Sequence, residues 1–177
     1  MDIGVCVASH VGDIDYVVRA EELGYSHAWL ADSQMLWSDC YAALALVADR
    51  TSTINIGTGV SVSGTRPAPV TAASIATINA LAPGRTFLGL GTGNTAMRIM
   101  GHKPQRIAEF DQYLEAIKPL LKGEEAEHSF GGHVSPIRHI MPDKGFVNFE
   151  DPIPLYVSGF GPKSLALAGK HADSAVL

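Results

Sequence analysis

The chain has 177 residues, of which 46% are hydrophobic and 18% are charged, and this balance is typical of a folded globular protein. Its formal net charge is −5, and its lysines and arginines are scattered, so no basic surface for nucleic acid or anionic lipid is expected. No run reaches the roughly 20 apolar residues of a membrane-spanning helix, and no signal-peptide pattern is found at the N-terminus. We therefore expect a cytoplasmic protein, without nucleic-acid or membrane partners, that binds a small molecule.

Short apolar runs alternate with segments of helical periodicity, a pattern typical of repeated βα units around a parallel sheet. Asp13 is the expected N-cap of the first helix, and Gly24 is its expected stop. Strands are predicted at residues 3–7, 27–30, 54–60, 86–90, 155–157 and 175–177, and helices at residues 14–23, 40–49, 67–81, 107–121 and 162–171.

A glycine-rich turn follows the fourth predicted strand. Gly91, Gly93 and Ala96 match the dinucleotide fingerprint, in which glycines allow a tight turn against a pyrophosphate. That fingerprint requires an acidic residue about 20 residues further on, at a strand end. Glu109 and Asp111 lie in that region but inside a helical pattern, which argues against a dinucleotide site.

Residues 123–151 break the regular alternation and are rich in glycine, histidine and proline. This segment is too long for an ordinary helix-to-strand connection. We interpret it as a hairpin or lid inserted into a single domain of residues 1–177, lying either over the binding face or elsewhere on the surface. The histidines around it, at positions 102, 128, 133 and 139, lack the spacing of metal ligands, so no metal site is expected.

The chain contains two cysteines, Cys6 and Cys40, which we expect to be buried, reduced thiols.

Several motifs in order resemble one known family. They are Gly-Thr-Gly-Val at 57–60, Thr-Arg-Pro at 65–67, Gly-Arg-Thr-Phe-Leu-Gly-Leu-Gly-Thr-Gly at 84–93 and Pro-Leu-Tyr-Val-Ser-Gly-Phe-Gly-Pro at 154–162. Their order and spacing resemble the bacterial luciferase-like superfamily, which includes FMN-dependent monooxygenases and reductases that use coenzyme F420.

The resemblance implies an α/β fold, a TIM-type (β/α)8 barrel with the flavin at the carboxyl-terminal mouth of the strands. Such a barrel needs about 200 residues or more. This chain accounts for about the first five and a half βα units. We expect a fragment of a longer protein or, alternatively, a barrel that is remodelled or completed by another chain.

The resemblance also implies site residues. Asp32 would lie beside the flavin ring, and Gly59 and Val60 would form a non-prolyl cis peptide behind it. Contacts to the flavin or substrate are expected from Thr92, Gly93 and Asn94, and contacts to the cofactor phosphate from Ser158, Gly159, Phe160 and Gly161. The structural alternatives are a loop cap at Asp32, a simple glycine bulge at Gly59 and a plain loop-to-helix turn at 158–161.

Departures from the family pattern narrow the chemistry. Asp32 is followed by Ser33 and Gln34, where many members carry histidine, and this departure argues against luciferase-type chemistry. Asn94 stands where one dehydrogenase branch has a proton-donating acid, which disfavours the activity on sugar phosphates.

Other polar and aromatic residues complete the expected site. His10 and Asn94 are the catalytic candidates. Trp37 either approaches the ring or is packed in the core. Arg66 either steadies an anionic substrate or pairs with a nearby acid.

We therefore predict a flavin-dependent oxidoreductase that transfers a hydride between FMN or F420 and a small organic substrate. The alternative is a shortened, noncatalytic flavin-binding protein or an inactive barrel fragment. By analogy with the family, a homodimer through the helices after strands two and three is expected.

Overall fold

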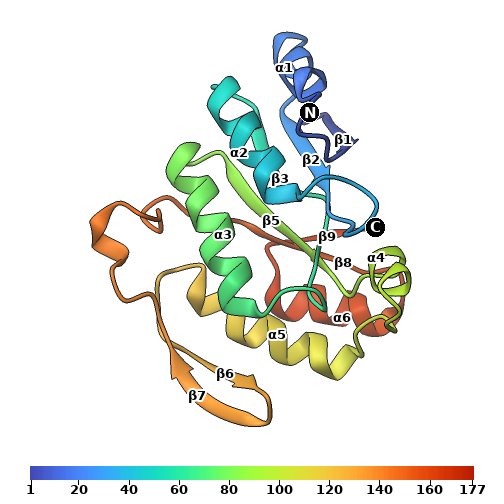
Figure 1. Cartoon of the computed structure of the whole chain (residues 1–177), viewed down its shortest axis with the longest axis vertical. Helices are drawn as coiled ribbons and strands as arrows, with labels where there is room; N and C mark the ends of the chain where they lie inside the picture. The colour runs from blue at the N-terminus through green and yellow to red at the C-terminus, as the bar shows by residue number, and fades with distance from the viewer.

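A computed structural model describes residues 1–177 and shows a parallel sheet covered by helices (Figure 1). The main sheet has seven strands in the order β1-β2-β3-β5-β8-β9, and β4 pairs with β5 off this path. The strands of this sheet are β1 (Gly4–Ala8), β2 (His27–Ala31), β3 (Asn55–Thr58), β4 (Ser61–Val62), β5 (Thr86–Gly91), β8 (Leu155–Ser158) and β9 (Ser174–Val176).

Helices connect these strands and pack side by side along the sheet, α2 on α3, α3 on α5, and α5 on α6 (Figure 1). They are α1 (Asp15–Glu22), α2 (Cys40–Arg50), α3 (Ala68–Leu81), α4 (Thr95–Ile99), α5 (Ile107–Leu120) and α6 (Pro162–His171). None of them is long and apolar enough to cross a bilayer.

The strand order confirms a barrel-type arrangement. Strands of a barrel follow one another around the sheet in chain order, whereas a dinucleotide-binding sheet reverses its order at a switch point. Here the order runs in one direction from β1 to β9, and the sheet curls into a half-barrel with β1 and β9 at its edges. Glu109 and Asp111 lie in α5, so the dinucleotide interpretation of the glycine turn is not supported.

The core lies between the outer face of the sheet and the helices. Alternate strand residues such as Leu30, Ile56 and Leu88 face the helices and are fully buried. On α5, Phe110, Leu114 and Ile117 recur at helical spacing and are buried, as their periodicity predicts.

The concave face of the half-barrel carries an aromatic cluster. The ring centroids of Trp29 and Phe87 are 4.3 Å apart, and Tyr156 lies 5.2 Å from Trp29 and 5.4 Å from Phe87. Gly57 lies opposite both Trp29 and Phe87 in the register. A Cβ atom at Gly57 would lie 2.3 Å from Phe87 Cδ2, so glycine is what lets these rings meet across β3.

The irregular segment contains the antiparallel hairpin of β6 (Ala126–Phe130) and β7 (His133–Ile137) and the short 3-10 helix η1 (Pro142–Lys144). The hairpin follows α5 and lies beside it, on the side away from the sheet (Figure 1). A connection from a helix end to a strand start lies at the amino-terminal end of the barrel. The segment is therefore a surface excursion and does not cover the mouth.

Several local predictions were wrong. The first helix begins at Asp15 with Ile14 as its N-cap, so Asp13 does not cap it. The third predicted strand, at 54–60, is interrupted after Thr58, because Gly59 and Val60 separate β3 from β4. The short helix α4 was not predicted, since five residues are too few to show a helical period.

The prediction of buried thiols holds for Cys40 and is wrong for Cys6, which is exposed. Cys6 is paired with Trp29 in the register, so its side chain lies on the concave face of the sheet, which the helices do not cover.

Candidate functional site

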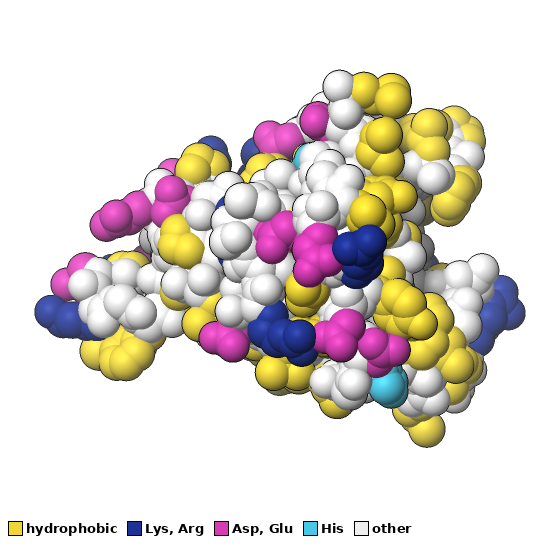
Figure 2. Space-filling model, turned by 90° about the horizontal axis from the view of Figure 1, so that it is seen from above, with side chains coloured by type: hydrophobic (Ala, Val, Ile, Leu, Met, Phe, Trp, Pro, Cys, Tyr) yellow, Lys and Arg dark blue, Asp and Glu magenta, His cyan; other side chains and the backbone are white.

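The parallel strands bring their carboxyl ends, and the loops that follow them, to one end of the half-barrel. This end, the mouth, lies on the right of Figure 1, near α4 and the C-terminus. Figure 2 shows a hollow on this side with hydrophobic side chains along its borders. The segments that form the mouth are 9–13, 32–39, 59–66, 92–94 and 158–161.

Asp32 is the most constrained polar residue of the mouth. It directly follows β2 and is only 6% exposed. Its Oδ2 atom accepts a hydrogen bond from the Arg66 guanidinium at 2.5 Å and a longer one from the Val62 backbone N–H at 3.3 Å. These partners compensate the burial of a carboxylate. Asp32 therefore links the end of β2 to the loop that follows β4. This role goes beyond that of a cap for its own loop.

Arg66 lies between two carboxylates. It also donates to Asp39 at 2.9 Å, and its guanidinium lies 4.9 Å from the centre of the Tyr41 ring. Partial burial alone would lower the pKa of Arg66, but the Asp32 carboxylate raises it above its usual value. Of the two roles considered for Arg66, the structure shows pairing with acids.

Asp39 completes this network from the start of α2. Its side chain accepts hydrogen bonds from the backbone N–H groups of Tyr41 and Ala42, both at 3.0 Å, and so caps the helix. Partial burial would raise the pKa of Asp39, but the Ala42 N–H and the Arg66 guanidinium together lower it.

Gln34 has an incomplete set of partners. Its Nε2 atom donates to Asp32 Oδ1 at 2.7 Å, while its Oε1 atom is buried without a hydrogen-bond donor. A buried acceptor without a partner costs free energy unless a ligand or water supplies the donor. In the sequence, Gln34 is recognisable only as a departure from the family pattern. Its unpaired oxygen could not be predicted, because the sequence does not show which amide oxygens lack a hydrogen-bond donor in the folded chain.

The peptide bond between Gly59 and Val60 is cis, as the resemblance implied. Val60 lies over β5, where Cβ atoms at Gly89 and Gly91 would come within 3.1 and 2.9 Å of its methyl groups. A Cβ atom at Gly59 would lie 2.7 Å from Trp29 Cβ. The partly exposed Val60 side chain thus forms a raised surface at the mouth, above the strand glycines.

The glycine turn after β5 is explained by packing within the chain. Gly93 has a φ of +71°, and a Cβ atom there would lie 2.2 Å from Val62 Cγ1. Asn94 follows it, exposed, and its Oδ1 atom accepts a hydrogen bond from Arg98 Nε at 2.6 Å. Thr92 accepts a backbone hydrogen bond from Gln105 at 3.2 Å. Asn94 is thus at the mouth, but its amide oxygen is already engaged.

The loop after β8 leads directly into α6. The N–H of Gly159 donates to Val176 O at 3.0 Å, and Phe160 is 83% exposed. The first helical hydrogen bond joins Leu165 N to Gly161 O. The N–H groups of Lys163 and Ser164 in this turn therefore have no carbonyl partner within the helix, the arrangement that favours an anion.

His10 and Trp37 share one cavity of about 630 Å³ between the end of β1, α1 and the loop after β2. Trp37 also borders a smaller cavity of about 190 Å³ that reaches Asp32 and Gln34. Trp37 is 41% exposed and lies at the mouth instead of in the core. The structure therefore brings the loop after β1, which carries His10, against the loop after β2, which carries Asp32 and Trp37.

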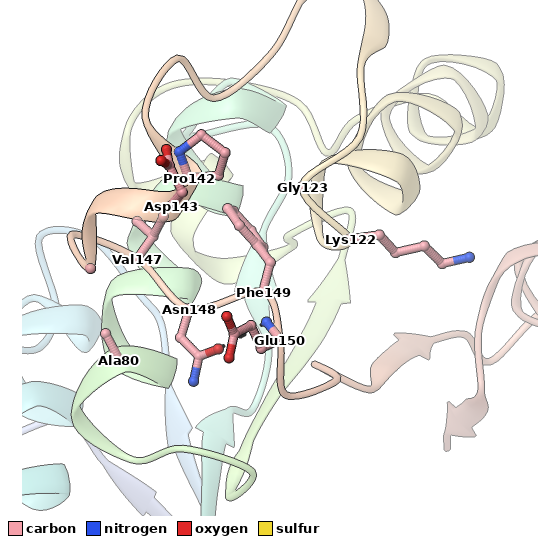
Figure 3. A pocket seen from close by; sticks show the side chains of 10 residues that line it. Ala80, Lys122, Gly123, Pro142, Asp143, Val147, Asn148, Phe149 and Glu150 are labelled. Atoms are coloured by element: carbon pink, nitrogen blue, oxygen red, sulfur yellow. Dashed lines mark hydrogen bonds between the residues drawn. The ribbon is translucent and has the colours of Figure 1, made fainter.

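A second large cavity, of about 610 Å³, lies at the opposite end of the half-barrel (Figure 3). Ala80, Lys122 and the segment around Phe149 line it, and the Lys122 side chain extends away from the other lining side chains. Because it lies where the strands begin, it is separate from the residues of the mouth.

Asp111, Glu115 and His171 form the one group of potential metal ligands. Lys170 Nζ already bridges the carboxylates of Asp111 and Glu115, each at 3.0 Å, and His171 Nε2 lies 2.6 Å from Asp111. The group is an ion-pair cluster that joins α5 to α6.

Comparison with known proteins agrees with this geometry. Residues 12–177 match the family model described as luciferase-like monooxygenase, and the chain belongs to this family. The F420-dependent hydroxymycolic acid dehydrogenase of Mycobacterium tuberculosis is 34% identical over 90% of this chain and 47% of its own length. The chain spans about half the length of the curated relatives it matches.

Solved structures show the same fold. The coenzyme F420-dependent tetrahydromethanopterin reductase of Methanopyrus kandleri superposes with a TM-score of 0.79 over 98% of this chain and 55% of the other, at 23% identity. The FMN complex of the oxygenating constituent of 3,6-diketocamphane monooxygenase from Pseudomonas putida gives a TM-score of 0.75 over 100% and 57%, at 18% identity.

Proposed function

We propose that this half-barrel is the cofactor-binding part of an oxidoreductase that transfers a hydride between FMN or F420 and a small organic substrate. One observation carries the proposal: Gln34 presents a buried, unpaired acceptor at the mouth, beside an Asp32 carboxylate that Arg66 holds in place. Relatives whose names specify F420 or FMN support the choice of cofactor.

The residues at the mouth fit such a cofactor. Flavins and deazaflavins carry ring N–H groups, and the Gln34 Oε1 atom needs a donor of this kind. Val60 offers an apolar surface against which a ring can lie. Bound there, the cofactor would supply the hydride chemistry, while the protein supplies position and exclusion of water.

The phosphate end of the cofactor is assigned to the segment 158–161 and the start of α6. The N–H groups of the first turn, together with the exposed Lys163, favour a phosphate there. Thr92 and Gly93 lie on the neighbouring strand end and would line the path between ring and phosphate.

His10 is the proposed proton-exchanging residue, because its ring lines the large cavity of the mouth and makes no hydrogen bond within the chain. Asn94 is proposed to orient the substrate or a flavin edge, which requires its amide to leave Arg98.

We also propose a homodimer through α2 and α3, on which Leu46, Val70 and Leu81 are exposed apolar residues. A cytoplasmic location is supported by the free thiols of Cys6 and Cys40.

The test is a titration of the purified chain with FMN and, separately, with F420, followed by ring absorbance and fluorescence. Saturable binding of one cofactor is expected. Binding without hydride transfer would identify a noncatalytic flavoprotein, and the absence of binding by either cofactor would contradict the proposal.

A further inference from the structure

The cavity that His10 and Trp37 share has walls of a distinct chemistry. Val7 and Ala8 line it from β1, Tyr16 from α1, and Leu36 and Trp37 from the loop after β2. These side chains come from separate elements and present mainly carbon atoms. A volume of about 630 Å³ lies within the range of about 300–1,000 Å³ typical of small-molecule sites.

The polar groups of this cavity are few, and some are already engaged. Ser9 Oγ donates to Ala31 O at 2.7 Å, and Ser38 Oγ accepts from Val11 N at 3.3 Å. The ring of His10 and the carboxylate of Asp13 make no side-chain hydrogen bond within the chain. The cavity therefore offers a ligand one imidazole ring and one carboxylate as hydrogen-bonding groups.

No lysine or arginine lines this cavity. The arginine of the neighbouring loop, Arg66, is already bound to Asp32 and Asp39. An anionic ligand would have to give up its hydration with no cation to replace the water, and Asp13 would repel it. A compound with an apolar body loses little favourable hydration when it enters the cavity. It gains free energy because its apolar surface is buried against the cavity walls.

We propose that this cavity binds an uncharged, mainly apolar compound with a hydrogen-bonding oxygen, such as a ketone or a secondary alcohol, and excludes phosphorylated or carboxylated compounds. As a substrate site this rests on the proposed function, because Trp37 and Ser38 join the cavity to the one that holds Asp32 and Gln34. The oxygen of the ligand faces His10, and its apolar body lies against Leu36 and Trp37.

The test is a two-dimensional ¹H–¹⁵N NMR titration of the chain without cofactor, using cyclohexanone and glucose 6-phosphate as probes. Cyclohexanone is expected to shift the indole signal of Trp37 and the amides of Ser9 and Leu36, whereas glucose 6-phosphate leaves them unchanged. Equal or stronger shifts with the phosphate, or cyclohexanone shifts confined to other parts of the chain, would overturn the proposal.

A matched pair of variants sharpens the test. Leu36→Asp places a charge on the cavity wall, and Val134→Asp places one on β7 away from it; Leu36 and Val134 are 49% and 57% exposed. We expect Leu36→Asp to weaken cyclohexanone binding at least tenfold and Val134→Asp to leave it unchanged. Equal effects would overturn the assignment. If the chain binds the ketone but neither FMN nor F420, the result would count against the proposed function and not against the cavity assignment.

Discussion

The guanidinium of Arg66 lies 2.5 Å from a carboxylate oxygen of Asp32, a residue that is only 6% exposed. This pair joins the loop after β4 to the end of β2, so the two segments are held together at the mouth. The same arginine reaches Asp39 at the start of α2. The pair therefore fixes the shape of the mouth, and its charges neutralise each other.

Removing Arg66 should destabilise the protein strongly. Arg66→Met keeps much of the side-chain volume but leaves the buried Asp32 carboxylate without its cation, a change that costs about 3–5 kcal/mol. Urea unfolding followed by circular dichroism measures this loss. Arg98→Met is the control, because Arg98 is exposed and donates only to Asn94. A loss equal to that of the control would show that the pair contributes little.

A double variant separates charge from packing. In Arg66→Met with Asp32→Asn, no buried charge is left unpaired, and Asp39, which also loses its partner, is exposed to water. We expect the double variant to recover part of the stability lost by Arg66→Met. Strictly additive losses would show that the two residues do not interact.

Glu21 should make stability depend on pH in the acidic range. Partial burial would raise the pKa of Glu21, but the backbone N–H groups of Ser52, Thr53 and Ile54, at 2.6–3.0 Å, lower it from its usual 4.5 to about 2. Because the folded-state pKa is depressed, the stabilisation is complete above about pH 4.5 and is lost as the pH falls toward 2.

Glu21→Gln tests this directly. The variant should be less stable than the parent protein at pH 7 by about 1–2 kcal/mol, and the difference should shrink as the pH falls toward 2. Thermal unfolding at a series of pH values measures it. Glu22→Gln, which loses only an exposed contact with Arg19, is the control. A difference that does not change with pH would refute the assignment.

Two glycine substitutions should act in opposite directions. Gly57→Ala places a Cβ atom 2.3 Å from Phe87 and should cost about 2 kcal/mol or more. Gly169→Ala lies within α6 and meets no atom within 4 Å, so it should stabilise by about 0.5–1 kcal/mol. Chemical denaturation of both variants measures the effects, and a Gly57→Ala variant as stable as the parent protein would contradict the packing of β3 against β5.

Gln34→Leu should weaken cofactor binding. The variant removes the buried acceptor that the proposal assigns to a ring N–H, and one such hydrogen bond corresponds to about a tenfold change in affinity. The cofactor titration measures this change, and Gln112→Leu on the exposed face of α5 is the matched control. An unchanged affinity would show that Gln34 does not contact the ring.

Much of the fold follows from local patterns. The periodicity that buries Phe110 and Ile117 predicts α5, and Pro162 predicts the start of α6. The break in the strand at Gly59 was harder to predict from the sequence, because it depends on how β3 packs against Trp29, a contact between residues that are distant in sequence. The start of α1 was misplaced because Asp13 is a favourable cap by residue type, although its side chain does not cap the helix.

The candidate site was predictable only in part. The family resemblance led us to expect Asp32 and Val60 beside the flavin, and the structure places both at the mouth. The pairing of Arg66 with Asp32 was not predicted, because the two residues are 34 positions apart in the sequence. The motif around Arg66 was compatible with both roles considered for Arg66. Gln34 could not be found, because its unpaired oxygen is a property of the folded chain.

The central claim is that the mouth of this half-barrel binds the cofactor, and amide ¹H–¹⁵N shifts recorded with and without the bound flavin or deazaflavin test it most directly. We predict shifts at residues 32–34, 59–62, 92–94 and 158–164 and none around Lys122 and Phe149, which line the cavity at the opposite end. Shifts centred on that opposite cavity, with the mouth unaffected, would contradict the claim.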